Sequence, residues 1–188
     1  NKYSNFADFP ILLNGEKVNK VTALWHKKAD QLKAQDLDEF YKFVSNDFES
    51  PLGHLHMSIE GVVNFKALVF IPKTAPSDLM RLHNEKSLHL YANKILIQND
   101  CKELLPEYLR FVKGVVDTTD LPLNISREVT QSSPEMLKIK SIITAKILSF
   151  LESWALSDKE KYAVFYKNFG PLLKVGINSD FENRDKII

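Results

Sequence analysis

Residues 105–117 read LPEYLRFVKGVVD, and this stretch lies in the strand-rich part of the chain, ahead of a helical part that begins at residue 134. Pro106 suits the first turn of a helix, because its missing amide costs nothing there. We therefore predict a helix over residues 108–112 that stops near Gly114, followed directly by a short Val-Val strand. A segment rich in Thr, Asp, Asn and Ser then occupies residues 117–131.

Upstream of this stretch, the pattern alternates between strand and helix. Asn14-Gly15 is a strong tight-turn signal between two extended segments. Apolar residues at helical spacing after Asp36 predict a helix with one apolar face, capped by the Asp36 side chain. Strands are predicted over residues 55–63, 64–71 and 87–97.

From Pro134 onward there is little strand signal. A long amphipathic helix is predicted from Pro134 onward, because apolar residues recur at spacings of three and four. This stripe consists of Met136, Ile139, Ile143, Ile147, Phe150 and Trp154. A capping box at Ser157 predicts a second helix that ends at Gly170, and a last helix is predicted from near Ser179.

The resulting layout is a mixed α/β layer over residues 1–133 followed by a helical connector over residues 134–188. Hydrophobic residues make up 44% of the 188 residues, which is enough to form a core and argues against wholesale disorder. The chain has 25 basic and 24 acidic side chains, so it lacks the basic excess of a nucleic-acid binder. No apolar run approaches the roughly 18 residues that span a bilayer. We expect neither a nucleic acid nor a membrane as partner.

Cys101 is the single cysteine, and it therefore cannot form an internal disulfide, which suits a reducing compartment. Lys102 beside it could lower the thiol pKa, but the sequence places no histidine partner, so we favour an unreactive thiol. The first 20 residues lack the charged start and apolar stretch of a signal peptide. Because the chain begins at an asparagine, we expect that it is a piece of something longer.

Other candidate sites are weak. His54 and His56 would share one face of a strand, but no cysteine or paired carboxylate nearby completes a metal site, so we favour two surface histidines and predict no metal. The 6 glycines form no phosphate-binding cluster, and no lipase-type serine elbow is present. The sequence therefore offers no self-contained active site.

What remains is the segment DLPLNISREVTQ, residues 120–131. From the residues alone, Arg127 is best interpreted as a solvated side chain near a helix start, paired with Glu128. Most exposed arginines have no catalytic role, and exposed ion pairs contribute little.

This segment, together with residues 105–117, resembles the catalytic-loop region of the heat-shock-protein-90 family. Further blocks follow in the order that this family shows. They read KYSNF (2–6), FPI (9–11), ALW (23–25), EFYK (39–42), SNDFESPL (45–52), FIP (70–72), AP (75–76), LY (90–91), KY (161–162) and FY (165–166). Because so many separate blocks share one order, we identify the chain as a member of this family.

The resemblance implies a large α/β/α sandwich followed by a three-helix connector. It also implies that the N-terminal ATP-binding domain, the rest of the middle domain and the C-terminal dimerisation domain lie outside this chain. This chain by itself would then need no cofactor and would neither bind nor hydrolyse ATP, whereas ATP and magnesium would bind to the full-length parent. We expect the parent to be a homodimer and the isolated chain to be a monomer.

The resemblance also assigns roles to single residues. Arg127 matches the family's arginine that reaches the ATP γ-phosphate in the neighbouring domain, and Gln131 matches a second polar residue used there. A guanidinium can stabilise the charge that develops during phosphoryl transfer. Arg127 could lower the chemical barrier or hold the two domains closed, and the sequence leaves both roles open. Leu121, Leu123 and Asn124 could dock the segment onto the nucleotide domain, although the leucines could equally be buried locally.

A second function implied by the resemblance is the holding of client proteins. Phe48 occupies the position at which many relatives carry an exposed tryptophan, and an exposed aromatic side chain is a plausible contact for a client. The alternative is that Phe48 packs against its own helix.

The chain departs from the family pattern at a few positions. Asn93-Lys94 stands where many members have two arginines, Leu96 where many have phenylalanine, and Thr74 where a basic residue is common. The short turn at Asn14-Gly15 resembles bacterial or organellar members more than eukaryotic cytosolic ones. We therefore expect the cytoplasm of a bacterium, with an organellar matrix as the alternative.

Two other functions compete with this interpretation. The first is a stand-alone α/β protein-interaction module with no link to ATP, in which Arg127 would be incidental. The second is an RNA-binding α/β domain, which the balanced charge and the lack of an aromatic-basic strand motif disfavour.

Overall fold

The computed structural model describes residue 6 and residues 12–17, 23–75, 88–120 and 133–187. Its centre is a five-stranded sheet in the order β3-β4-β7-β5-β6. Neighbouring strands are antiparallel, except that β5 and β7 run parallel. The strands are β3 (Gly53–Ile59), β4 (Phe65–Ile71), β5 (Leu88–Ala92), β6 (Ile95–Cys101) and β7 (Lys113–Thr118). A separate hairpin pairs β1 (Leu12–Leu13) with β2 (Glu16–Lys17) across the predicted turn at Asn14-Gly15.

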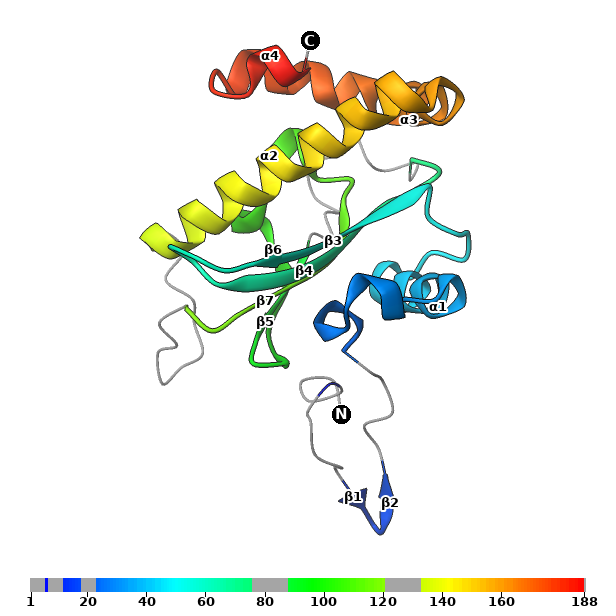
Figure 1. Cartoon of the computed structure of the whole chain (residues 1–188), viewed down its shortest axis with the longest axis vertical. Coiled ribbons are helices and arrows are strands. Elements are labelled where there is room, and N and C mark those ends of the chain that lie inside the picture. The colour runs from blue at the N-terminus through cyan, green and yellow to red at the C-terminus, as the bar shows by residue number, and fades with distance from the viewer. Residues whose placement is uncertain (1–5, 7–11, 18–22, 76–87, 121–132, 188) are drawn as a thin grey trace.

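Helices lie on both faces of this sheet (Figure 1). Helix α1 (Ala34–Ser45) packs below it, while α2 (Pro134–Ser157) crosses the opposite face. Helices α3 (Lys159–Ser179) and α4 (Arg184–Ile187) lie on the α2 side, farther from the sheet. Among the described residues there are also short 3-10 turns: η1 (Leu24–His26), η2 (Ala29–Gln31), η3 (Lys102–Leu104) and η4 (Glu107–Leu109). The predicted α/β class, with a helical part after the sheet, is confirmed.

Strand β4 shows why the sheet needs helices on both faces. Successive side chains of a strand point to opposite faces, and nearly every residue of β4 is buried. One face of the strand carries Phe65, Ala67, Val69 and Ile71, which join a core with α2 and α3. The other face carries Leu68 and Phe70, which join a second core with α1 and η1.

The predicted long helix after Pro134 is confirmed as α2, and all but one of its stripe residues are buried; Phe150 is only partly buried. The next helix differs from the prediction at both ends. Its start is capped by Asp158, whose carboxylate accepts the Lys161 N–H at 3.0 Å, rather than by Ser157. It then continues past Gly170 to Ser179. No helix in the described part of the chain is long and apolar enough to cross a membrane.

The prediction of one strand over residues 87–97 is wrong, because Asn93 and Lys94 form a two-residue turn between β5 and β6. Both residues have positive φ angles, 50° and 64°, and Ala92 pairs directly with Ile95. Two consecutive positive φ angles are the geometry of the tight hairpin turn that matches strand twist. The apolar residues on either side of this turn therefore belong to two strands.

Two helix predictions also need correction. The helix predicted over residues 108–112 is only the single turn η4, and Gly114 lies inside β7 rather than at a helix end. Gly114 is required there, because its φ is 137° and a Cβ would lie 2.2 Å from the Leu68 carbonyl oxygen of β4. Helix α1 begins at Ala34 without a side-chain cap, so the capping role predicted for Asp36 is wrong, although the predicted apolar face is buried.

Candidate functional site

The residues predicted to be catalytic or to dock a neighbouring domain lie outside the described residues. They are Leu121, Leu123, Asn124, Arg127 and Gln131. Their predicted roles stay predictions. The structure does describe the two ends between which these residues lie, Asp120 two residues after β7 and Ser133 directly before α2.

The first end is held by a group of hydrogen bonds that we call the Asn64–Asp120 clamp, formed by Asn64, Thr118 and Asp120. The backbone N–H and the side-chain Nδ2 of Asn64 both donate to Asp120 Oδ2, at 2.5 and 3.0 Å. Thr118 Oγ1 donates to the Asn64 carbonyl at 2.7 Å and accepts the Asp120 N–H at 3.1 Å. The clamp thus ties the end of β7 to the turn that leads into β4.

The charged form of Asp120 is favoured by this arrangement. The N–H of Asn64 makes the largest contribution to lowering the pKa of Asp120, and hydrogen bonds from Thr119 and the Asn64 side chain add to it, against an opposing effect of burial. Hydrogen bonds to the ionised form of a carboxyl lower its pKa. Asp120 is therefore a charged acceptor at neutral pH.

The second end is held by the cap of α2. Ser133 is buried, its Oγ accepts the Met136 N–H at 3.2 Å, and its carbonyl accepts the Leu137 N–H at 3.1 Å. Pro134 occupies the first helical turn, where no N–H is needed. Residues 121–132 are thus flanked by a strand end and a helix start that both belong to the packed body.

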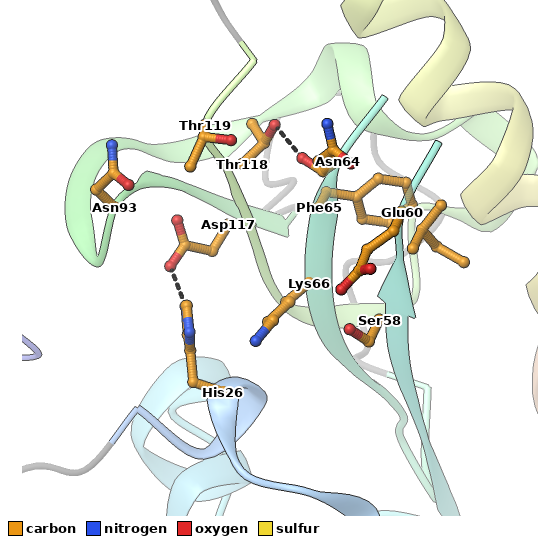
Figure 2. Close-up of a pocket in the computed structure, with 11 residues that line it drawn as sticks. His26, Ser58, Glu60, Asn64, Phe65, Lys66, Asn93, Asp117, Thr118 and Thr119 are labelled. Carbon is orange, nitrogen blue, oxygen red and sulfur yellow. Dashed lines mark hydrogen bonds and ion pairs between the residues drawn. The ribbon is translucent and has the colours of Figure 1, made fainter. Parts of the chain in front are cut away.

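A pocket of about 190 Å³ lies beside the clamp. Asn64, Thr118 and Thr119 form one side of it, and the ends of β3 and β4 form another (Figure 2). The Lys66 ammonium points into the open space beside His26. The remaining lining residues are Ser58, Ile59, Glu60, Phe65, Asn93 and Asp117.

Asp117, one of the residues that line the pocket, is buried, with 4% of its surface exposed. Its Oδ2 accepts the indole N–H of Trp25 at 2.9 Å and the backbone N–H of Lys94 at 3.0 Å. His26 Nε2 lies 2.8 Å from the same oxygen, as the dashed line in Figure 2 marks. One carboxylate therefore joins η1, the β5–β6 turn and β7. Hydrogen bonds to an ionised group are stronger than neutral ones, so this junction is firm.

The described residues form no group of three or more histidine, cysteine or acidic side chains that could hold a metal. His56 Nε2 instead lies 3.1 Å from the Trp25 carbonyl oxygen, and burial, with smaller effects of His56 and Lys161, lowers the pKa of His54. Burial, reinforced by Glu103, raises the pKa of the Cys101 thiol to about 12. This agrees with the prediction of an unreactive thiol.

Phe48 lies in the connection between α1 and β3, and its side chain is 95% exposed. The alternative in which it packs against its own helix is therefore wrong. The backbone around it is held, because Asp47 accepts the Tyr41 hydroxyl at 2.8 Å and the Glu49 N–H at 3.1 Å. A large apolar side chain is thus presented to solvent on an ordered turn. Its role as a client contact stays a prediction.

Sequence reasoning missed Asn64, His26 and the buried role of Asp117. Asn64 and Asp120 are 56 residues apart, and His26 and Asp117 are 91 apart, so no local spacing connects them. The only signal was an aspartate directly after the predicted Val-Val strand, which the strand pattern did not require. A buried acid at such a position needs donors, and the search for them could have started there.

Comparison with known proteins gives matches along the whole chain. A family model described as "Hsp90 protein" matches residues 11–188. The chain is 54% identical over 190 residues to "Chaperone protein HtpG" of Chlorobium luteolum, covering 100% of this chain and 30% of that protein. The protein of the same name from Geobacter sulfurreducens is 39% identical over 211 residues, covering 99% of this chain and 32% of that protein. The chain thus spans less than a third of the length of these relatives.

Proposed function

This chain belongs to the Hsp90 family, and from this membership we propose that it is the middle segment of an ATP-dependent molecular chaperone. In this proposal the chain supplies Arg127 to the γ-phosphate of an ATP that another domain of the parent holds. The observation that carries the proposal is the match over the whole chain with relatives named as chaperones. ATP and magnesium would supply the reactive phosphoryl group and its charge neutralisation outside this chain.

The proposed contribution of this chain to hydrolysis is electrostatic. Negative charge is spread over the γ-phosphate oxygens in phosphoryl transfer, and an arginine from another domain can stabilise it. Arg127 provides the guanidinium, and Gln131 provides a second polar contact. Leu121, Leu123 and Asn124 would dock the segment onto the nucleotide domain. The hydrogen bonds at Asp120 and Ser133 support this role, because they tie the residues on either side of the segment to the packed body.

The second proposed activity is the holding of client proteins through Phe48. Exposed aromatic side chains on ordered surfaces favour protein contacts, since they bury a large apolar area without loss of backbone entropy. The 95% exposure of Phe48 supports this role. The partners in this proposal are the N-terminal ATP-binding domain of the parent and unfolded clients, in a homodimeric parent in the bacterial cytoplasm.

The stand-alone module remains the alternative to an ATP-linked role. This alternative predicts that substitution of Arg127 does not change the ATP turnover of the parent. Family membership argues against this alternative. The chain also covers only 30% of a chaperone relative, and the rest of that relative offers further domains with which such a segment could act.

The first experiment compares ATP turnover of the full-length parent and its Arg127→Ala variant, with ATP affinity measured alongside. We expect kcat to fall by a factor on the order of a thousand if the guanidinium acts on the phosphoryl group, with little change in affinity. Arg184→Ala is the matched control, because Arg184 is an exposed arginine on α4. Unchanged turnover in Arg127→Ala would leave client holding as the function of this segment.

A second experiment tests Phe48 with a heat-unfolded protein whose aggregation the parent suppresses. Phe48→Ala should weaken the suppression without changing thermal stability, because the side chain contributes almost no buried area. Val62→Ala is the control, since Val62 is also apolar and 82% exposed but lies near the β3–β4 turn. An equal effect of the two substitutions would argue against a specific contact at Phe48.

A further inference from the structure

The pocket beside the clamp is lined by a row of polar side chains on one face of the sheet. Lys66 of β4 lies directly opposite Ser58 of β3 and directly opposite Asp117 of β7. Residues that face one another across neighbouring strands point to the same side of a sheet. The same face of β4 carries Leu68 and Phe70, which pack with α1 and η1. The polar row therefore lies where this apolar face ends, and all three of its side chains line the pocket.

The Asp117 carboxylate does not pair with Lys66, although the two residues are direct cross-strand neighbours. Asp117 Oδ2 accepts the Trp25 and Lys94 N–H groups, and His26 Nε2 lies 2.8 Å from the same oxygen. An ionised carboxylate can only accept hydrogen bonds, so this nitrogen of His26 carries a proton. Three donors thus satisfy Asp117. Lys66 makes no ion pair within the part of the chain that the structure describes, and its ammonium points into the open space beside His26 (Figure 2).

A second charge without an ion pair lies in the same pocket. Glu60 directly follows β3, is exposed and also lines the pocket. Among the described residues it has no ion pair either, not even with Lys66. A simple anion in the pocket would be attracted by Lys66 but repelled by Glu60, and a simple cation would meet the reverse. A ligand that carries both charges can use both residues.

We propose that this pocket binds a small zwitterion of the free α-amino acid class, whose carboxylate pairs with Lys66 and whose ammonium pairs with Glu60. The Ser58 hydroxyl, opposite Lys66, adds a hydrogen-bond donor for the carboxylate. The pocket volume of about 190 Å³ is below the roughly 300–1,000 Å³ of sites for drug-sized ligands, so the ligand has about ten non-hydrogen atoms or fewer. This binding site does not depend on ATP or on the proposed function.

The test measures binding of L-valine to the full-length parent by saturation-transfer difference NMR, which observes the small ligand and suits weak binding. We expect saturable binding with a Kd on the order of a millimolar, because so small a ligand makes few contacts. Isovalerate is valine without its amino group, and isobutylamine is valine without its carboxyl group. Each should bind about fivefold more weakly than valine, because it loses one ion pair. Absence of saturable valine binding, or equal binding of isovalerate or isobutylamine, would overturn the proposal.

Glu60→Gln separates a zwitterion site from a plain carboxylate site, because the two predict opposite results. It should weaken valine binding by about fivefold if Glu60 holds the ammonium. At a plain carboxylate site it would tighten valine binding, because it removes a repulsion. An unchanged or tighter Kd in Glu60→Gln would therefore overturn the proposal. Glu60 is exposed, so this variant should fold normally.

Lys66→Met keeps an apolar stem but removes the charge, so it should also weaken valine binding by about fivefold. The matched control is Lys73→Met. Lys73 is exposed and lies two residues beyond the other end of β4, outside the pocket, so its substitution should leave the Kd unchanged. A loss in Lys73→Met as large as in Lys66→Met would show that binding follows net charge rather than this pocket, and would overturn the proposal. If Lys66→Met fails to fold, Glu60→Gln alone decides the outcome.

Discussion

Removal of the Asp117 carboxylate should destabilise the fold more than removal of any exposed acid. Its Oδ2 accepts the N–H groups of Trp25 and Lys94, and the Trp25 side chain is completely buried. A hydrogen bond to a charged group contributes about 1.5–3 kcal/mol, so the loss of these two comes to about 3–6 kcal/mol in Asp117→Ala. Domains have a total stability of about 5–15 kcal/mol, which makes this loss a large share.

Asp117→Asn separates shape from charge. The amide keeps one oxygen that can accept the Trp25 and Lys94 N–H groups, but it lacks the negative charge that strengthens these bonds. We expect a loss of about 1–2 kcal/mol, clearly smaller than for alanine. The order Asp117→Ala, Asp117→Asn, wild type is therefore the expected order of increasing stability.

The assay is denaturant unfolding of the chain, followed by tryptophan fluorescence. The chain has 2 tryptophans, so Trp154→Phe leaves Trp25 as the only reporter, beside the altered carboxylate. Unchanged denaturant slopes would show that only stability changes. Asp158→Ala is the control, since loss of an exposed helix cap costs about 1 kcal/mol. A loss in Asp117→Ala no larger than in this control would refute the reasoning.

Three further predictions concern the body of the fold. Gly114→Ala should lower the free energy of unfolding by about 3 kcal/mol or more, because φ is 137° and the Cβ would meet the Leu68 carbonyl; near-normal stability in the same assay would contradict this. Cys101, 1% exposed and with its thiol pKa raised to about 12, should react with a disulfide reagent at pH 8 only after unfolding, and rapid labelling of the native chain would contradict this. Asp180 accepts the Tyr108 hydroxyl at 2.7 Å; burial opposes its charge, but hydrogen bonds from Tyr108 and its neighbours outweigh this and lower the pKa of Asp180 below 3.8. The stabilisation from ionised Asp180 is thus present above pH 3.8 and is lost as the pH falls through the lower pKa of the folded state. The stability difference between wild type and Tyr108→Phe should therefore shrink below about pH 4. A stability difference that stays constant with pH would contradict this.

The sequence pattern predicted a helix or turn correctly where the residues of that element alone produce the pattern. The α2 stripe was predictable because helical spacing places Met136, Ile143 and Ile147 on one face whatever they pack against. The hairpin at Asn14-Gly15 was predictable because few residues other than Asn and Gly adopt positive φ angles readily. The ordered blocks along the chain supplied the family, and the alternation of strand and helix patterns predicted the α/β class independently.

Local pattern failed where burial removes the contrast between faces. Residues 108–112 are all buried, including Arg110, so their pattern was compatible with a helix although only one turn forms. The turn at Asn93-Lys94 was missed for a different reason, because apolar residues precede and follow it and neither turn residue is a glycine. Periodicity reports exposure differences, and a fully buried segment has none.

The sequence by itself determined that this chain is an α/β member of the Hsp90 family with a helical part after the sheet, because apolar spacing and ordered sequence blocks are local properties. Only the tertiary structure decided which polar residues meet. Asn64 reaches Asp120, and His26 and Trp25 reach Asp117, because the order of the strands in the sheet brings the start of β4 and the turn η1 to the end of β7. Such contacts depend on strand order and on hydrogen bonds that buried polar groups must find, and neither is written in the spacing of neighbouring residues.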